Sequence, residues 1–97
     1  KPQRIPDIAP HDFNLMQNYP NPFNPSTTIE YTIPENSVVT LKIYDILGKE
    51  VASLVNKYQN QGSYIVMWNA ENMSSGLYIY KLTAGSYSDT KKMVLSK

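Results

Sequence analysis

Three prolines stand within six residues of one another near the start of this chain, at Pro20, Pro22 and Pro25. Each proline removes a backbone donor and fixes φ, and each pushes the residue before it out of the α region. The stretch can therefore be neither a helix nor a central strand. It predicts a rigid, extended elbow that leads into an alternating strand, and so the start of a compact β domain.

The elbow also holds the residues that are expected to fix it in place. Its three asparagines are expected to close Asx-type turns through their side chains; they are Asn18, Asn21 and Asn24. Tyr19 and Phe23 give the elbow an apolar face that we expect to press onto a core. The segment thus predicts both local turn closure and anchoring to the rest of the domain.

Length and composition limit the kind of protein this can be. The chain has 97 residues, no cysteine and a formal net charge of +1. The length fits one domain, and without cysteine there is no disulfide or thiolate metal site. The small net charge gives no general attraction to nucleic acid or anionic membranes, and no apolar run approaches the ~20 residues that cross a bilayer. The chain does not open with the pattern of a signal peptide, and we expect the sequence to be a piece cut from a longer protein.

The N-terminal segment, residues 1–13, reads as an extended linker because prolines are spread among polar residues. The alternative is a short edge strand around residues 13–17 that pairs with the rest of the domain. The single histidine of the chain, His11, lies in this segment and is expected to be a solvated residue. Residues 14–97 are then the folded domain.

From residue 27 onward apolar and polar residues alternate with period two, which is typical of half-buried strands. Six alternating stretches are predicted as strands, at residues 27–33, 38–44, 50–55, 63–68, 77–83 and 87–95. Residues 45–48 predict a type I turn with Gly48 at positive φ. Residues 56–62 are polar and end in glycine, so they predict a loop.

The number of these strands and their spacing indicate a sandwich or a barrel. We predict an all-β fold, an immunoglobulin-like two-sheet β-sandwich of about seven short antiparallel strands. Trp68 is expected to anchor the core, helped by tyrosines that hydrogen-bond at their outer ends. The apolar series of the alternating strands consists of Ile29, Tyr31, Ile33, Val39, Leu41, Ile43, Tyr64, Val66, Trp68, Tyr78, Tyr80, Leu82, Met93 and Leu95.

The residue types that catalysis needs are scarce in the predicted fold. Serine has no histidine partner outside the linker, and the eight carboxylates do not show the spacing of an acid–base pair. We therefore predict that the chain is not an enzyme and has no catalytic, cofactor or metal site. Turn capping is favoured over a calcium site for two oxygen-rich groups, which are Asn18, Asn21 and Asn24, and Asn69, Glu71 and Asn72.

Two kinds of binding surface have simpler interpretations. The tyrosines outside the inward series could stack on sugars, although exposed tyrosine is common on β surfaces; they are Tyr44, Tyr58 and Tyr87. Nucleic-acid binding needs clustered basic residues among aromatics. The only basic cluster is Lys91, Lys92 and Lys97, and the tyrosines are favoured as core residues, so no nucleic-acid partner is predicted.

Five motifs follow one another along the chain. They are the asparagine–proline elbow, an Ile-Tyr-Asp-x-x-Gly hairpin at residues 43–48, a strand from Gly62 to Trp68, a Ser-Gly-x-Tyr-x-Tyr strand at residues 75–80 and a terminal Lys-Met-x-Leu-x-Lys at residues 92–97. In order and spacing they resemble the C-terminal sorting domain of the type IX secretion system, the Por secretion tail family of type A. The signature residues here are Asn18, Pro20, Asn21, Pro22, Phe23, Asn24, Pro25, Asp45, Gly48, Trp68, Gly76, Tyr78 and Tyr80.

The resemblance covers about residues 15–97 and implies a function. Members of this family form the last domain of a larger exported protein, which enters the periplasm of a Gram-negative bacterium by a separate signal. The outer-membrane translocon recognises the folded tail, and a sortase-like peptidase commonly removes it. The chain would then be an address label that sends its cargo to the cell surface or outside. Asn69 stands where relatives often have Asp, which leaves any charge-dependent role of that loop open.

The terminal strand is the predicted recognition element, read through its edge by β-addition or through its basic side chains. The recognition residues of this hypothesis are Lys91, Lys92, Met93, Leu95 and Lys97. The linker before Phe13 is the predicted processing region. Two alternatives stay open: a non-catalytic sugar-binding accessory module, and a structural adaptor like the similar module of the flagellar hook-capping protein. An unpaired edge strand could also join two copies into a homodimer.

Overall fold

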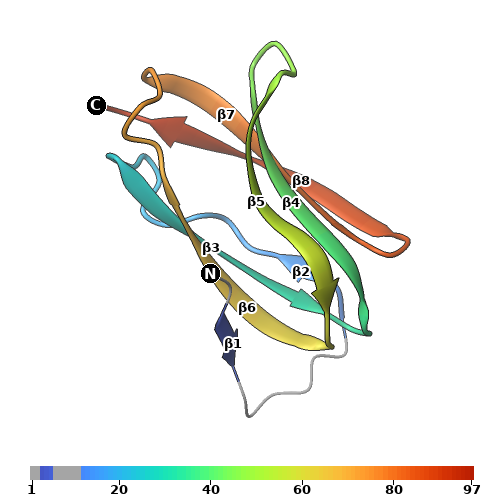
Figure 1. Cartoon of the computed structure of the whole chain (residues 1–97). Coiled ribbons are helices and arrows are strands. Elements are labelled where there is room, and N and C mark those ends of the chain that lie inside the picture. Colours follow the sequence, from blue (N-terminus) through green and yellow to red (C-terminus); the bar gives the residue numbers. More distant parts are fainter. Residues whose placement is uncertain (1–2, 6–11) are drawn as a thin grey trace.

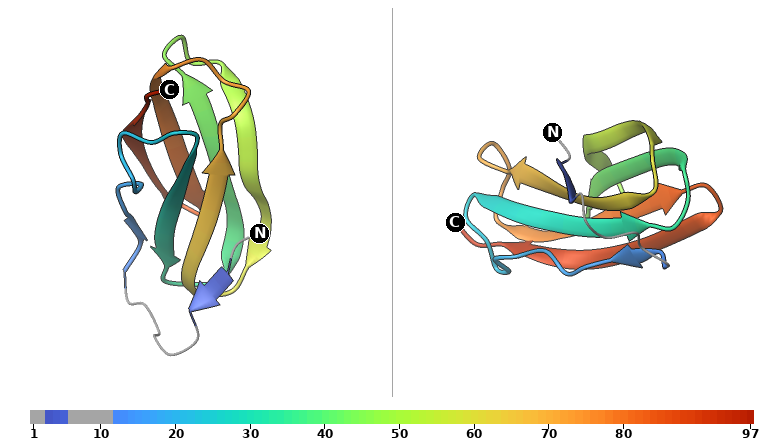
Figure 2. Two further views of the ribbon diagram at one scale, coloured as in Figure 1. Left: turned by 90° about the vertical axis from the view of Figure 1, so that its left-hand side faces the viewer. Right: turned by 90° about the horizontal axis from the view of Figure 1, so that it is seen from below.

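The chain folds as two packed antiparallel sheets, seen in a computed structural model that describes residues 3–5 and 12–97. The described strands are β1 Gln3–Ile5, β2 Asn14–Leu15, β3 Ser26–Ile33, β4 Ser37–Asp45, β5 Glu50–Gln59, β6 Gly62–Asn69, β7 Gly76–Ala84 and β8 Tyr87–Leu95. The sheets have the strand orders β1-β6-β3-β2 and β5-β4-β7-β8 and face one another (Figures 1 and 2). The predicted all-β two-sheet sandwich is confirmed. Among the described residues, no helix has the length and hydropathy that a membrane span requires.

The core lies between the two sheets and is formed by the residues that alternate inward. Every member of the apolar series predicted from the sequence is buried. Trp68 on β6 contacts two rings at centroid distances of 5.8 Å and 5.7 Å, those of Phe23 from the elbow and Tyr78 on β7. Because β6 and β7 belong to different sheets, this ring cluster joins both layers and the elbow, as the prediction of an anchoring tryptophan implies.

The core tyrosines bury their rings and direct their hydroxyl groups to polar partners at the margins of the core. The hydroxyl of Tyr80 makes two hydrogen bonds, because it donates to Met16 O at 2.7 Å and accepts from Asn18 N at 2.8 Å. The other hydroxyl groups donate at 2.6–2.7 Å, from Tyr31 to Gln59 Oε1, from Tyr64 to Asn60 O and from Tyr78 to Ser74 O. The expectation that tyrosines hydrogen-bond at their outer ends is confirmed.

The turn between β4 and β5 has the predicted structure. Gly48 has φ of +85°, and its N–H donates to Asp45 O at 3.0 Å. The Asp45 carboxylate Oδ1 accepts from Leu47 N and Lys49 N at 2.9 Å and 3.0 Å. Glycine is needed here because a left-handed backbone strains most other residues.

The predicted loop at residues 56–62 is wrong. β5 continues to Gln59, and β6 begins at Gly62. Asn56 and Tyr58 lie opposite Thr40 and Val38 in the β4–β5 ladder. β5 is the outer strand of its sheet, so its side chains are exposed widely and need not be apolar, which is why this part of the strand has the composition of a loop.

The elbow differs from its prediction in two details. Phe23 is buried as expected, but Tyr19 is half exposed. The backbone of Tyr19 pairs with Thr28, so this part of the elbow alternates like a strand, with Asn18 inside and Tyr19 outside. The predicted Asx turns are wrong for two of the asparagines: Asn18 Nδ2 donates to Pro20 O and Thr27 Oγ1, and Asn21 Oδ1 accepts from the distant Val94 N.

Near the N-terminus the structure contains two short strands, β1 and β2. β1 lies inside the segment predicted as a linker and pairs with β6. A strand of three residues is too short to show an alternating pattern. β2 pairs with β3, which confirms the alternative of an edge strand around residues 13–17. His11 and most of the remaining linker lie outside the described residues.

Burial of the tyrosine hydroxyls predicts a loss of stability at high pH. Burial is the main cause that raises the pKa of Tyr80 to about 12, and burial also raises that of Tyr31. Below pH 10 both rings are neutral in the folded and unfolded states, so their contribution is complete. Between pH ~10 and the raised pKa only the unfolded state releases the proton, so stability falls as pH rises.

We expect Tyr80→Phe to lower the free energy of unfolding by about 1–2 kcal/mol at pH 8, because one buried and one partly buried hydrogen bond are lost. The variant should also lose less stability than the wild type between pH 10 and 12. Urea unfolding across this range measures both effects. Tyr58→Phe is the control, because Tyr58 is 60% exposed and its removal should leave the pH profile unchanged. An unaltered profile in Tyr80→Phe would contradict the assignment.

Candidate functional site

The terminal strand β8 has neighbours on both of its edges over its last residues. Its inner edge pairs with β7, from Ala84 opposite Tyr87 to Gly76 opposite Leu95. Its outer edge is covered by the elbow, which runs alongside it (Figure 2). We call this second contact the clasp; it consists of Gln17, Asn21 and Phe23 with residues 92–96.

Four hydrogen bonds form the clasp. Phe23 N donates to Val94 O, and Ser96 N donates to Phe23 O, both at 2.9 Å. The side chain of Asn21 accepts from Val94 N at 2.9 Å, and that of Gln17 donates to Lys92 O at 2.7 Å. The elbow thus takes the place of a parallel neighbouring strand, partly with backbone and partly with side-chain groups.

The first half of β8 makes different contacts. Thr90 N faces the same edge of the strand as the clasped Val94 N, and it donates to Asp89 Oδ1 at 2.9 Å. The ring of Tyr87 stacks on that of Phe13, with centroids 5.3 Å apart. Over residues 92–96 the elbow binds Lys92 O, Val94 N, Val94 O and Ser96 N, so this part of the outer edge is occupied.

The elbow is itself held firmly by the core. Phe23 is buried against Trp68. Asn18 is 2% exposed, and its backbone N–H binds the Tyr80 hydroxyl while its side chain binds Thr27. The clasp is therefore attached to both sheets at once, and the position of β8 depends on the packing of the elbow.

The structure separates the predicted recognition residues into different classes. Met93 and Leu95 are buried in the core. Lys92 is exposed, and Lys91 is half-buried on the opposite face of the strand. Lys97 is anchored, because its N–H donates to Ser75 Oγ and its ammonium group donates to Glu71 O. Four of the five residues lie on β8 and Lys97 follows it, and the five do not form one continuous exposed patch.

The candidate sugar-stacking tyrosines are not brought together. Tyr44 pairs with Glu50 at one end of the β4–β5 ladder, whereas Tyr58 pairs with Val38 at the other end. Tyr87 is expected outside the inward series, but it is on the core-facing side of β8. It lies opposite Ala84, whose side chain is buried, and its ring stacks on that of Phe13. Three separated rings give no common platform for a sugar chain.

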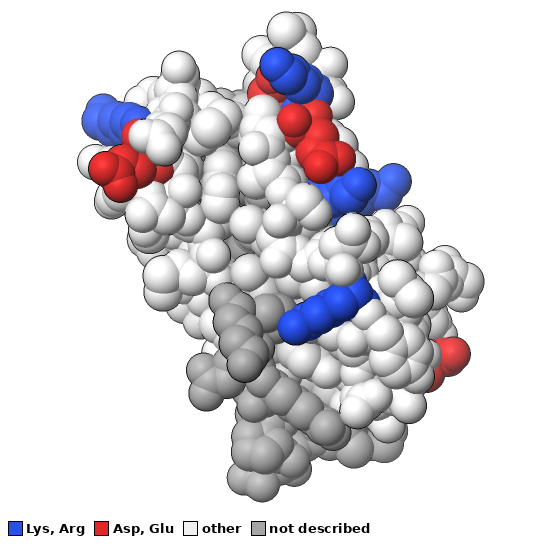
Figure 3. All heavy atoms as spheres, viewed as in Figure 1, with Lys and Arg blue, Asp and Glu red and all other residues white. Residues whose placement is uncertain are grey.

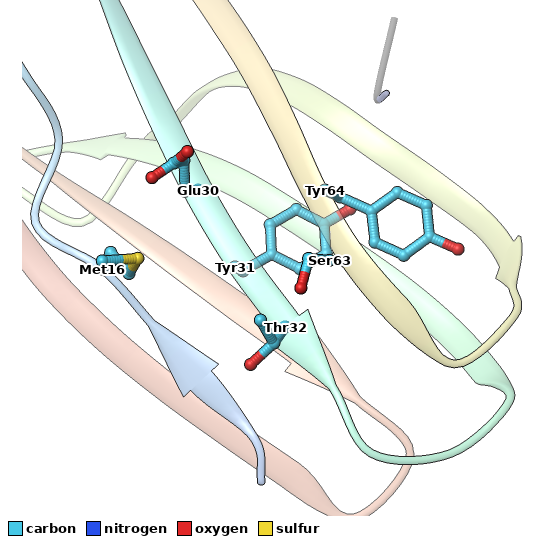
Figure 4. A pocket seen from close by; sticks show the side chains of 6 residues that line it. All are labelled: Met16, Glu30, Tyr31, Thr32, Ser63 and Tyr64. Atoms are coloured by element: carbon cyan, nitrogen blue, oxygen red, sulfur yellow. The ribbon is translucent and has the colours of Figure 1, made fainter. Parts of the chain in front are cut away.

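A small pocket lies on the other sheet, where β3 and β6 run past the residue that follows β2. Figure 4 shows that Met16, Glu30 and Thr32 lie on one side of β3, while the tyrosine rings point to the other side. Its lining residues are Met16, Glu30, Tyr31, Thr32, Ser63 and Tyr64. They include one carboxylate and no lysine, histidine or cysteine. The pocket therefore offers no acid–base pair and no nucleophile with a base.

The oxygen-rich loops hold their own hydrogen bonds. The side-chain oxygens of Asn18, Asn21 and Asn69 accept from Gln17 Nε2, Val94 N and Glu71 N. The described residues contain no group of three His, Cys, Asp or Glu side chains arranged to hold a metal ion. On the face that Figure 3 shows, basic and acidic side chains lie next to one another toward the upper end, other charged side chains stand apart, and the surface is mainly uncharged.

Sequence reasoning did not identify Gln17, Glu71 and Ser75 as partners of the chain end. Each of them reaches residues 92–97 through a contact between positions 22–75 apart in the sequence. No local pattern signals such a pairing. The elbow motif signals only that a rigid segment exists, not which strand it covers.

A comparison with protein families identifies the chain. The family model described as a secretion system C-terminal sorting domain matches residues 17–96. No curated protein matches the chain. The match spans most of the sequence, from the elbow to the terminal strand, so the chain belongs to this family. Its members are the sorting signals of type IX secretion cargo.

The clasp predicts a local effect of Asn21→Ala. Loss of the side-chain acceptor leaves Val94 N to water, so we expect the amide hydrogen of Val94 to exchange faster and the domain to lose about 0.5–1.5 kcal/mol. Hydrogen exchange followed by NMR measures the first effect, and urea unfolding measures the second. Asn24→Ala in the same elbow is the matched control, because Asn24 is exposed. Equal exchange at Val94 in wild type and Asn21→Ala would show that the clasp bond is not formed.

Proposed function

We propose that the type IX translocon reads this sorting domain through the basic side chains of a clasped terminal strand and not by strand addition to its edge. The observation that carries the proposal is the clasp. It occupies the outer edge of residues 92–96 while the Lys92 side chain remains exposed. A partner can then approach the side chains of β8 more easily than its backbone.

The two buried members of the predicted element act indirectly. Met93 and Leu95 are packed in the core, so they hold β8 in place and are not themselves contacted by a partner. Lys92 and Lys91 supply the contacts, on opposite faces of the strand. Lys97 lies two residues beyond the end of the strand and is fixed beside Glu71 and Ser75.

The wider role follows from the family. The domain is a non-catalytic tail that directs the cargo joined to it to the cell surface or outside. The cargo passes through the periplasm, and a sortase-like peptidase cuts the chain in the segment before Phe13.

We expect Lys91→Ser/Lys92→Ser to reduce surface delivery of a fluorescent protein fused before residue 1 in a bacterium with this secretion system, and to leave the fusion in the periplasm. Deleting residues 96–97 should have the same result, because it removes both Lys97 anchors and the Ser96 bond of the clasp. Cell fractionation and surface fluorescence measure delivery. Lys57→Ser is the matched control, since Lys57 is exposed on β5, the strand at the other edge of the same sheet. Normal delivery of both altered tails would overturn the proposal.

A further inference from the structure

The tip of the β4–β5 hairpin carries two aliphatic side chains that project into solvent. Leu47 is 89% exposed and Ile46 is 67% exposed. The turn stands out beyond the neighbouring strand ends in two views at right angles (Figures 1 and 2). Leu47 has the largest exposed fraction of any large hydrophobic residue that the structure describes.

The turn does not need these side chains in order to form. Its shape is fixed by Gly48 at positive φ and by the Asp45 carboxylate, which accepts from two backbone N–H groups of the turn. Positions of this kind commonly hold polar residues. Because Ile46 and Leu47 pack against so little of the domain, its stability gives no reason for them to be apolar. The backbone that carries them is, however, already ordered by these hydrogen bonds before any partner arrives.

The hairpin tip lies at the same end of the sandwich as the end of the chain. In the sheet register Asp45 lies opposite Tyr78, and Tyr78 lies opposite Met93. The residues after Asp45 and those after Met93 therefore lie beyond the same end of the sheet, as Figures 1 and 2 also show. A partner large enough to contact the exposed end of β8 is thus near the tip.

We infer that Ile46 and Leu47 form a second contact for the partner that reads β8, and that they insert into an apolar pocket of that protein. The inference rests on the proposed function, because it assigns the tip to the same recognition event. Two aliphatic side chains on a turn whose backbone is already ordered suit a hydrophobic pocket, since the turn itself need not be ordered when they are buried. The tip would then supply affinity and the lysines of β8 would supply charge complementarity.

The charges around the tip favour a protein pocket over a lipid surface. Asp45 and Glu50 flank the turn with carboxylates, and Lys49 is the cation between them. Glu50 pairs with Lys42 at 3.2 Å. An anionic bilayer surface attracts clustered basic residues and repels carboxylates. A tip with this balance of charge gains no electrostatic attraction from an anionic bilayer surface.

The test uses the same fluorescent fusion in cells with a type IX secretion system. We expect Ile46→Ser/Leu47→Ser to lower surface delivery severalfold, since burial of one such side chain is worth about tenfold in affinity. Ile46→Val/Leu47→Met keeps apolar chemistry and should retain delivery. The matched control is Val38→Ser/Met67→Ser, which removes two side chains that are 59% and 68% exposed elsewhere on the domain. Thermal unfolding midpoints should be equal for the wild type and the serine variant of the tip.

The outcomes separate this inference from the proposed function. Normal delivery of the tip variant, together with failure of Lys91→Ser/Lys92→Ser, overturns the inference and leaves the role of β8 intact. Normal delivery of both variants overturns both. Equal losses in the tip variant and in Val38→Ser/Met67→Ser would also overturn it, because the effect would not be specific to the tip. Binding of the fusion to phosphatidylglycerol vesicles that is lost with Leu47→Ser would assign the tip to lipid instead. Should the double variant unfold at lower temperature, the single variant Leu47→Ser decides the same questions.

Discussion

The structure depends on the clasp between the elbow and the terminal strand. Phe23 contributes both its backbone groups and its side chain, because its N–H and C=O bind Val94 and Ser96 while its ring packs on Trp68. One residue thus joins the edge of one sheet to the core between both. Without this contact β8 would be an edge strand with a single neighbour, β7, and its final residues would be free to fray.

The sequence predicts the faces of the strands well. Alternation identified the buried series on β3, β4, β6, β7 and β8, because in a two-sheet sandwich one face of each strand must be apolar. It failed on β5, where residues 56–58 are polar although they belong to a strand. An outer strand exposes much of its surface, so composition alone does not distinguish it from a loop. β1 was missed for a simpler reason, since three residues contain too little pattern.

The candidate site could be predicted only in part. The Lys-Met-x-Leu-x-Lys motif identified β8, and alternation correctly placed Met93 and Leu95 inward. The bond from Val94 to Asn21 spans 73 positions of sequence, and no local rule predicts such a pairing. The three elbow asparagines were expected to act within their own turns, because Asx turns are the usual local use of this side chain. Asn21 instead supplies an acceptor to another strand, which only the three-dimensional arrangement reveals.

The prolines of the elbow have a physical reason in this arrangement. A segment that covers an edge strand normally becomes the new edge and exposes its own row of N–H and C=O groups. Pro20, Pro22 and Pro25 have no N–H, so three positions of the elbow offer no backbone donor to a further strand. Between them, Phe23 directs both backbone groups toward β8. The elbow therefore ends the sheet without presenting a regular ladder of its own, and the terminal strand is held by a neighbour that is a poor template for further strand pairing.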